Sequence, residues 1–104
     1  MFNDLIDKTI NVLKVGGLEK FERGPSDNIN KPHCIMGAFD CVLGGEFKID
    51  CREYQYLLID IESNIPKQYK TNRIPGWDIA DYNNAPNTTV QDVIDLLERS
   101  KDVN

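Results

Sequence analysis

Residues 88–97 constrain the fold of this chain more than any other segment, because they predict both the start of a helix and its buried face. Apolar side chains recur there at the i, i+3, i+4 and i+7 spacing of an amphipathic helix: Val90, Val93, Ile94 and Leu97. Two overlapping capping boxes, which satisfy N–H groups in the first turn of a helix, precede this stripe: Thr88 with Gln91, and Thr89 with Asp92. Pro86 blocks extension of the helix towards the N-terminus.

A second amphipathic helix is predicted over residues 4–15. Its apolar stripe follows the same helical period: Leu5, Ile6, Thr9, Ile10 and Leu13. Asn3 is the predicted N-cap, and the Gly16-Gly17 pair supplies the stop at the other end. Residues 18–31 are turn-like, with Leu18 and Phe21 expected to pin them onto the core.

The segment 33–45, HCIMGAFDCVLGG, is apolar nearly all round. Its length and its shortage of β-branched residues favour a buried helix over a buried strand, and Gly44-Gly45 ends it. Gly37-Ala38 removes side-chain bulk, so we expect another helix, the C-terminal one in particular, to approach closely there. His33 is expected at the helix entrance, solvated or bonded to nearby backbone, with Cys34 and Cys41 as small apolar fillers.

A further helix is predicted over residues 52–62, with Asp50 as its cap. The stripe consists of Tyr54, Leu57, Leu58 and Ile61. Residues 46–50 are either a connector or a short β element, and residues 64–77 read as a long irregular stretch. The fold class that follows is mainly α: a compact single domain over residues 1–104, with about four helices and frayed last residues.

The neighbouring His33 and Cys34 do not form a convincing catalytic pair. Adjacent side chains on a helix point about 100° apart, whereas a thiolate and its base must lie within hydrogen-bond reach. The spacing of Cys34, Cys41 and Cys51 also lacks the close ligand pairs of a zinc site. We therefore predict no catalytic residues, no metal and no cofactor.

The charge balance limits the kinds of partner. Twelve Lys and Arg against seventeen Asp and Glu give a net charge of −5, which disfavours extended nucleic-acid binding. No window approaches eighteen consecutive apolar residues, so we expect no membrane span. The opening residues are amphipathic and do not resemble an export signal. We expect a cytoplasmic location with reduced thiols.

Aromatic and basic side chains gather in and around the long irregular stretch, and they are the candidate ligand- or partner-binding residues: Lys67, Lys70, Arg73, Trp77, Tyr82 and Asn83. Aromatic faces combined with cations suit a nucleotide-like ligand. The alternative is that Trp77 and Tyr82 only anchor the stretch onto the helices. Asp78 and Asp81 lack the ligand spacing of a calcium loop.

Two segments, CIMGA at residues 34–38 and IADYNNAPNTTVQDV at residues 79–93, together resemble a family of small bacterial and phage proteins of unknown function. Its members carry a Cys-x-x-Gly-Ala segment, then an aromatic-Asn-Asp turn, a Pro and a Thr-x-x-Glu/Asp-Val helix start. This sequence has Tyr82 where tryptophan is usual, Asn84 where the acid is usual and Thr88 where a basic residue is usual. The resemblance implies a mainly helical domain in an accessory or mobile-element context, and it favours Thr89 with Asp92 as the cap.

The function expected from these observations is that of a non-enzymatic binding module. We expect a phage or mobile-element accessory protein, in the host cytoplasm if phage-encoded, that engages a host (defence) protein or sequesters a small nucleotide-like ligand. Homo-oligomerisation through a helical face fits a chain of this size. The alternatives are a small hydrolase that uses Cys34 or the Asp78/Asp81 cluster, and a purely structural or assembly component.

Overall fold

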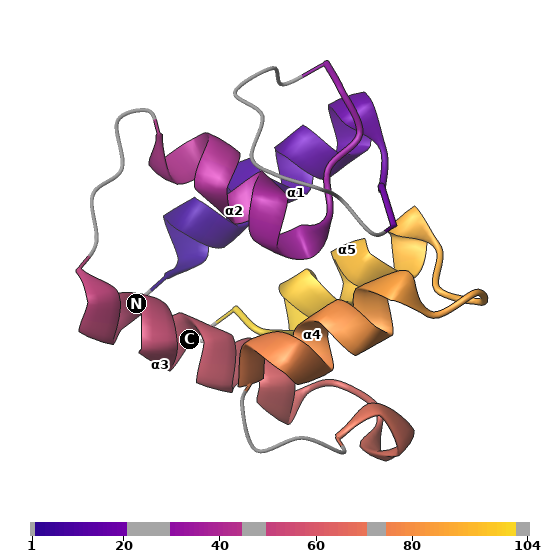
Figure 1. Ribbon diagram of the computed structural model, residues 1–104. Coiled ribbons are helices and arrows are strands. Elements are labelled where there is room, and N and C mark those ends of the chain that lie inside the picture. The colour runs from indigo at the N-terminus through magenta and orange to yellow at the C-terminus, as the bar shows by residue number, and fades with distance from the viewer. Residues whose placement is uncertain (1, 21–29, 45–49, 71–74, 102–104) are drawn as a thin grey trace.

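The computed structural model describes residues 2–20, 30–44, 50–70 and 75–101. These residues form five α-helices and one short 3-10 helix: α1 (Asn3–Gly16), α2 (Ile35–Leu43), α3 (Cys51–Ser63), η1 (Lys67–Tyr69), α4 (Pro75–Asn84) and α5 (Val90–Arg99). The protein is a mainly α globule, as predicted (Figure 1). The described residues contain no strand, only an isolated bridge between Leu18 and His33. The β element considered at residues 46–50 lies outside the described residues, except for Asp50.

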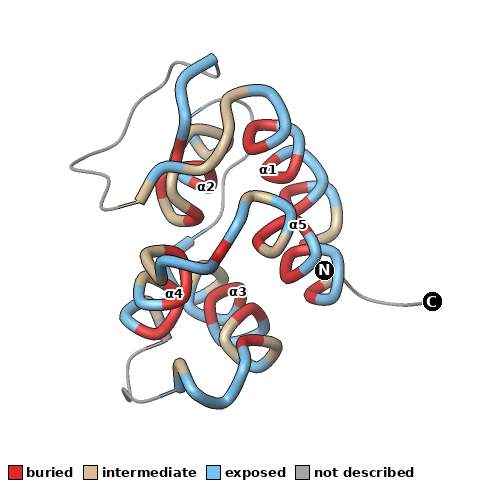
Figure 2. Tube along the Cα trace, turned by 90° about the vertical axis from the view of Figure 1, so that its right-hand side faces the viewer, coloured by how far each residue is buried: buried red, intermediate tan, exposed pale blue. Residues whose placement is uncertain are grey.

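The helices pack in two connected groups. Helix α1 contacts α2 and α5, helix α3 contacts α4, and α2 joins the groups by packing on α4. Figure 2 shows that the buried residues lie on the helix sides facing the interior. None of the described helices is long and apolar enough to cross a membrane.

The predicted stripes of α1, α3 and α5 form much of the core. In α5, Val93 and Leu97 are fully buried and Ile94 is 6% exposed, whereas Val90 is only partly buried. In α1, Leu13 is fully buried at the centre of the cluster. Burying one side chain of this kind contributes about 1.5–3 kcal/mol, so these stripes supply the main driving force for packing.

The helix starts follow the capping predictions in two of three cases. Thr89 Oγ1 accepts from Asp92 N at 3.1 Å while Asp92 Oδ2 accepts from Thr89 N at 3.0 Å, which confirms this pair as the operative cap. Asp50 caps α3 as predicted. The prediction of Asn3 as N-cap is wrong: Asn3 is already helical, and the buried Phe2 precedes it. Gly17 ends α1 at φ +90°, a conformation that glycine adopts readily.

Helix α2 confirms the buried-helix prediction but corrects three details of it. Cys34 is the N-cap and not a core filler, because its Sγ accepts from Gly37 N at 3.2 Å. His33 is fully buried, which excludes the solvated alternative. The expected approach of the C-terminal helix is also wrong, because α2 packs mainly on α1 and α4 while α5 lies against α1.

Helix α4 occupies a segment that the sequence presented as loop. Proline is tolerated in the first turn of a helix, so Pro75 begins α4 within the stretch 64–77 that we predicted as irregular. Its buried positions are the apolar Ile79 and Tyr82 and the polar Asp78 and Asn83. A polar residue at a core position obscures the apolar stripe by which a helix is normally predicted.

Candidate functional site: a cleft between α2 and α4

A small cleft of about 100 Å³ opens between the start of α2 and the second half of α4. It is lined by Cys34, Ile35, Met36, Ile79, Ala80, Asn83 and Asn84. Every one of these residues belongs to segment 34–38 or segment 79–93, the two segments that carry the family resemblance. The fold thus brings together two stretches that are about 45 residues apart in the sequence.

The amide side chain of Asn83 fixes the relative position of the two walls. Its Oδ1 accepts from Ile35 N at 3.0 Å, and its Nδ2 donates to Glu19 O and Asn84 Oδ1, both at 3.1 Å. Asn83 is only 2% exposed, and a buried amide with these partners satisfies backbone groups that would otherwise lack them. Asn83 therefore ties α4 to the start of α2 and to the segment after α1.

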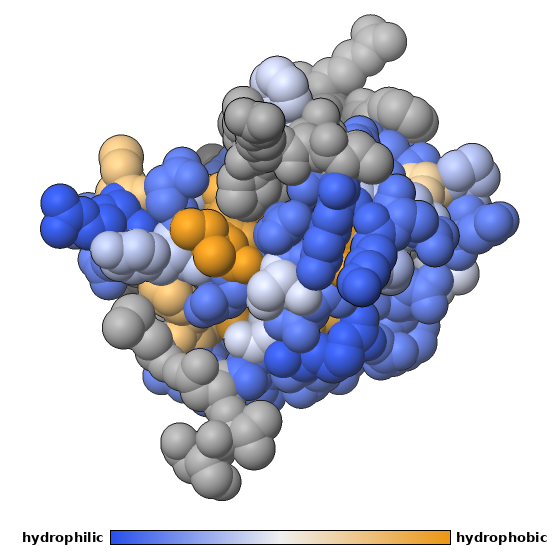
Figure 3. Space-filling view, turned by 90° about the horizontal axis from the view of Figure 1, so that it is seen from below, coloured by the Kyte–Doolittle hydropathy of each residue, from blue (hydrophilic) through white to orange (hydrophobic). Residues whose placement is uncertain are grey.

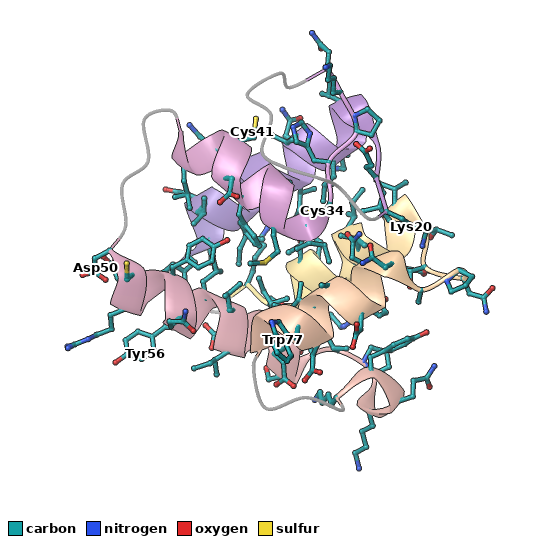
Figure 4. The ribbon with its side chains drawn as sticks, in the orientation of Figure 1. Lys20, Cys34, Cys41, Asp50, Tyr56 and Trp77 are labelled. Atoms are coloured by element: carbon teal, nitrogen blue, oxygen red, sulfur yellow. The ribbon has the colours of Figure 1, made fainter. Side chains whose placement is uncertain are left out.

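Lys20, in the segment after α1, also binds the C-terminal end of α4. Its ammonium donates to the carbonyls of Asn83 at 3.2 Å and Thr88 at 2.9 Å, and also to Ala85. These carbonyls lie at or just beyond the C-terminus of α4, where the helix dipole favours a cation. Figure 4 shows Lys20 beside this end of α4. This role could not be predicted from the sequence, because Lys20 lies more than 60 residues from its partners.

The side chain of Met36, a cleft residue of α2, lies close to both α3 and α4. Tyr54 of α3 directs its hydroxyl towards Met36 Sδ, 4.0 Å away. The Met36 methyl group lies 3.9 Å from where a Cβ on Gly76 would be, so α4 approaches this side chain closely. Burial raises the pKa of the Tyr54 phenol above its ordinary value of 10.0, with smaller contributions from Asp40 and Cys34.

The predicted binding residues do not gather at one point. Trp77 is 61% exposed, and it shares a face of α4 with the cleft residues Ala80 and Asn84, three and seven positions further on. Tyr82 faces inwards, and its ring packs edge to face on the ring of Tyr69, with 5.2 Å between the ring centroids. Asn83 is the structural amide described above.

The two predicted basic residues that the structure describes, Lys67 and Lys70, do not line the cleft. Lys67 is exposed on η1, and Lys70 donates to the carbonyl of Ser63 at 3.0 Å. Arg73 lies outside the described residues. Sequence reasoning missed Met36 and Ala80 as cleft residues, because only the packing of α2 against α4 gives them this place.

The carboxylates considered for the alternative function point in different directions. Asp81 is exposed, whereas Asp78 is fully buried and hydrogen-bonded to Glu62 of α3. Burial and then this hydrogen bond raise the pKa of Glu62, against an opposing effect of Lys70. Within the described ranges, no three His, Cys, Asp or Glu side chains are grouped so that they could hold a metal ion.

The described residues form a small α-helical fold in which segments 34–38 and 79–93 meet at one cleft. Its family is shown by sequence: residues 2–103 match the model of DUF6197, a family of unknown function, and the chain belongs to that family. Neither the curated proteins nor the solved structures include one with significant similarity to this chain.

Proposed function

We propose that this protein is a non-enzymatic protein-binding module, with the α2/α4 cleft and the adjacent Trp77 as its recognition surface. The observation that carries the proposal is an exposed tryptophan on the same helix face as an apolar-walled cleft. Exposed large aromatic side chains beside a small pocket are typical of the residues that dominate protein–protein binding energy.

The size of the cleft favours a protein over a nucleotide-like ligand. Pockets for small molecules and cofactors measure about 300–1,000 Å³, whereas this cleft measures about 100 Å³. It has room for one apolar side chain from a partner. Met36 and Ala80 are the partly exposed apolar residues of its lining, and the buried Ile35 and Ile79 lie behind them. The partner would also contact the exposed ring of Trp77 beside the cleft.

The resemblance to phage and mobile-element proteins suggests the kind of partner. Because the resemblance implies an accessory or mobile-element context, we propose a host (defence) protein as the ligand. The net charge of −5 supports this choice over an extended nucleic acid, because a phosphate backbone requires a basic surface.

The test compares variants of the recognition surface with a variant elsewhere. Trp77→Ala removes the exposed ring, and Ala80→Phe fills the cleft from α4. Val15→Ala is the control, because Val15 is also an exposed apolar side chain, at 52%, but lies on α1. The four tagged proteins, wild type included, are used to capture partners from host lysate, and each captured protein is then titrated in purified form.

Trp77 is the single tryptophan of the chain, so its fluorescence reports directly on this surface. We expect a purified partner to shift the emission to shorter wavelength, and to bind Trp77→Ala and Ala80→Phe at least tenfold more weakly than wild type and Val15→Ala. A partner that binds all four proteins equally, or capture of a small molecule alone, would contradict the proposal.

A further inference from the structure

The exposed face of α3 carries two large apolar side chains that no other element of the described chain covers. Tyr56 is 52% exposed and Ile59 is 49% exposed. Arg52, Asp60 and Ser63 are exposed on the same face, opposite the buried Leu57, Leu58 and Ile61. The underside of the molecule shows apolar atoms surrounded by hydrophilic ones (Figure 3).

Four exposed positions along this face are spaced symmetrically about its midpoint. The midpoint of the face lies between Leu57 and Leu58, so Tyr56 and Ile59 stand at equal distances from it. Arg52 and Ser63 stand at equal distances further out. A twofold axis through the midpoint would therefore place Tyr56 of each copy against Ile59 of the other, which is the requirement for a self-complementary contact.

The charges on this face distinguish between the two directions of pairing. In an antiparallel pair, the guanidinium of Arg52 reaches the end of the second helix where Asp60 and Ser63 lie, and the symmetry makes this contact twice. In a parallel pair, Arg52 would face Arg52 and Asp60 would face Asp60, and both contacts repel. The charge pattern thus selects the antiparallel arrangement.

We infer that α3 is a self-association surface through which two copies of this chain form an antiparallel, twofold-symmetric dimer. The inference rests on residues of α3 and does not depend on the cleft proposed for the protein partner. Helix α3 has thirteen residues and is about 20 Å long, so the interface is smaller than the roughly 800 Å² per partner of a standard complex. The dimer is accordingly weak and reversible.

Sedimentation equilibrium on the wild-type protein tests the dimer directly. Between about 10 μM and about 1 mM, where small interfaces associate, the average mass should rise from the monomer value of 11.9 kDa towards twice that value. Ile59→Asp should weaken association by at least 30-fold or so, because it buries a charge at the centre of the contact. Val15→Asp makes the same chemical change at the exposed Val15 of α1 and should leave the association unchanged.

A charge exchange tests the direction of the pairing. Arg52→Glu should weaken the dimer roughly tenfold, because both symmetric contacts then repel. The double variant Arg52→Glu/Asp60→Arg should restore most of the affinity. Circular dichroism confirms that each variant folds, and since all the changed side chains are exposed, folding should be retained.

Three results would overturn the inference. The first is a wild-type protein that stays monomeric up to 1 mM or so, which would leave the face to a different partner. The second is equal weakening by Val15→Asp and Ile59→Asp, which would indicate a general effect of charge. The third is a charge exchange that fails to restore association.

Discussion

The carboxamide of Asn83 makes hydrogen bonds to three segments of the chain, and a change there tests the structure of the cleft. Asn83→Ala leaves the buried N–H of Ile35 and the carbonyl of Glu19 without this partner. Each such loss costs about 1–3 kcal/mol, so we expect the free energy of unfolding to fall by about 2–4 kcal/mol in urea denaturation.

Asn87→Ala is the matched control, because Asn87 is exposed in the turn after α4. Its effect should be within about 0.5 kcal/mol of zero. If both variants lose the same stability, Asn83 does not join the two walls of the cleft.

Cys34 can be tested as a helix cap independently of its place in the cleft. Because its Sγ accepts from Gly37 N, a serine hydroxyl can take over the same contact with better geometry. We expect Cys34→Ser to leave the unfolding free energy unchanged or slightly higher, and Cys34→Ala to lower it by about 0.5–1 kcal/mol. Cys51→Ala, at an exposed thiol in the first turn of α3, is the control and should have almost no effect on thermal or urea unfolding.

Equal losses of stability in Cys34→Ser and Cys34→Ala would show that Cys34 contributes through packing and not as a cap.

The contact between α3 and α4 carries a pH dependence through Glu62 and Asp78. The folded protein raises the pKa of Glu62 above the ordinary value of 4.5, through burial and the hydrogen bond with Asp78. A carboxyl whose pKa is raised by folding binds its proton more tightly in the folded state, so its stabilising effect is complete below pH 4.5. That effect is lost as the pH rises through the raised pKa.

Glu62→Gln should therefore gain stability relative to wild type as the pH rises from 4.5 to neutrality, because the amide keeps the contact without a charge. Urea denaturation at several pH values measures this difference. Glu19→Gln, at an exposed carboxylate, should follow the wild-type curve. A Glu62→Gln protein whose pH profile runs parallel to wild type would show that the carboxyl pair does not form.

The helices that were predicted correctly are those whose signals are local. The stripe and capping box of α5, and the Asp50 cap of α3, lie within a few residues of the helix they define, and the structure confirms them. Helix α4 escaped prediction because Pro75 and Gly76 fall in the stretch 64–77 that we predicted as irregular, and because Asn83 holds an inward position that an apolar residue normally fills. An inward Asn gains its stability from partners on other segments, which no window of the sequence contains.

The same reasoning explains what could be predicted of the site. The resemblance was drawn from segments 34–38 and 79–93, and Trp77 and Asn83 were proposed as binding residues from their chemistry. Nothing in either segment indicated that they line one cleft, since the contact depends on α2 packing against α4. Tyr82 was grouped with Trp77 as an aromatic residue, yet five positions along a helix place the two side chains on different faces.

At the scale of the whole molecule, Lys20 connects the segment after α1 to the end of α4 and the turn between α4 and α5. Lys20 and Asn83 act on the same junction, so Lys20→Met should weaken contacts on both sides of the cleft and not only near residue 20. Hydrogen bonds from a charged donor are worth about 1.5–3 kcal/mol, and we expect the unfolding free energy to fall by roughly that amount.

Native-state hydrogen exchange of the Lys20→Met protein should show the amides of Ala85, Thr88 and Ile35 losing protection together, because Asn83 transmits the change to α2. Lys31→Met removes the same charge at an exposed lysine and should change none of these amides. If Lys20→Met exposes only Ala85 and Thr88 while Ile35 stays protected, the α4 turn and the start of α2 are stabilised independently.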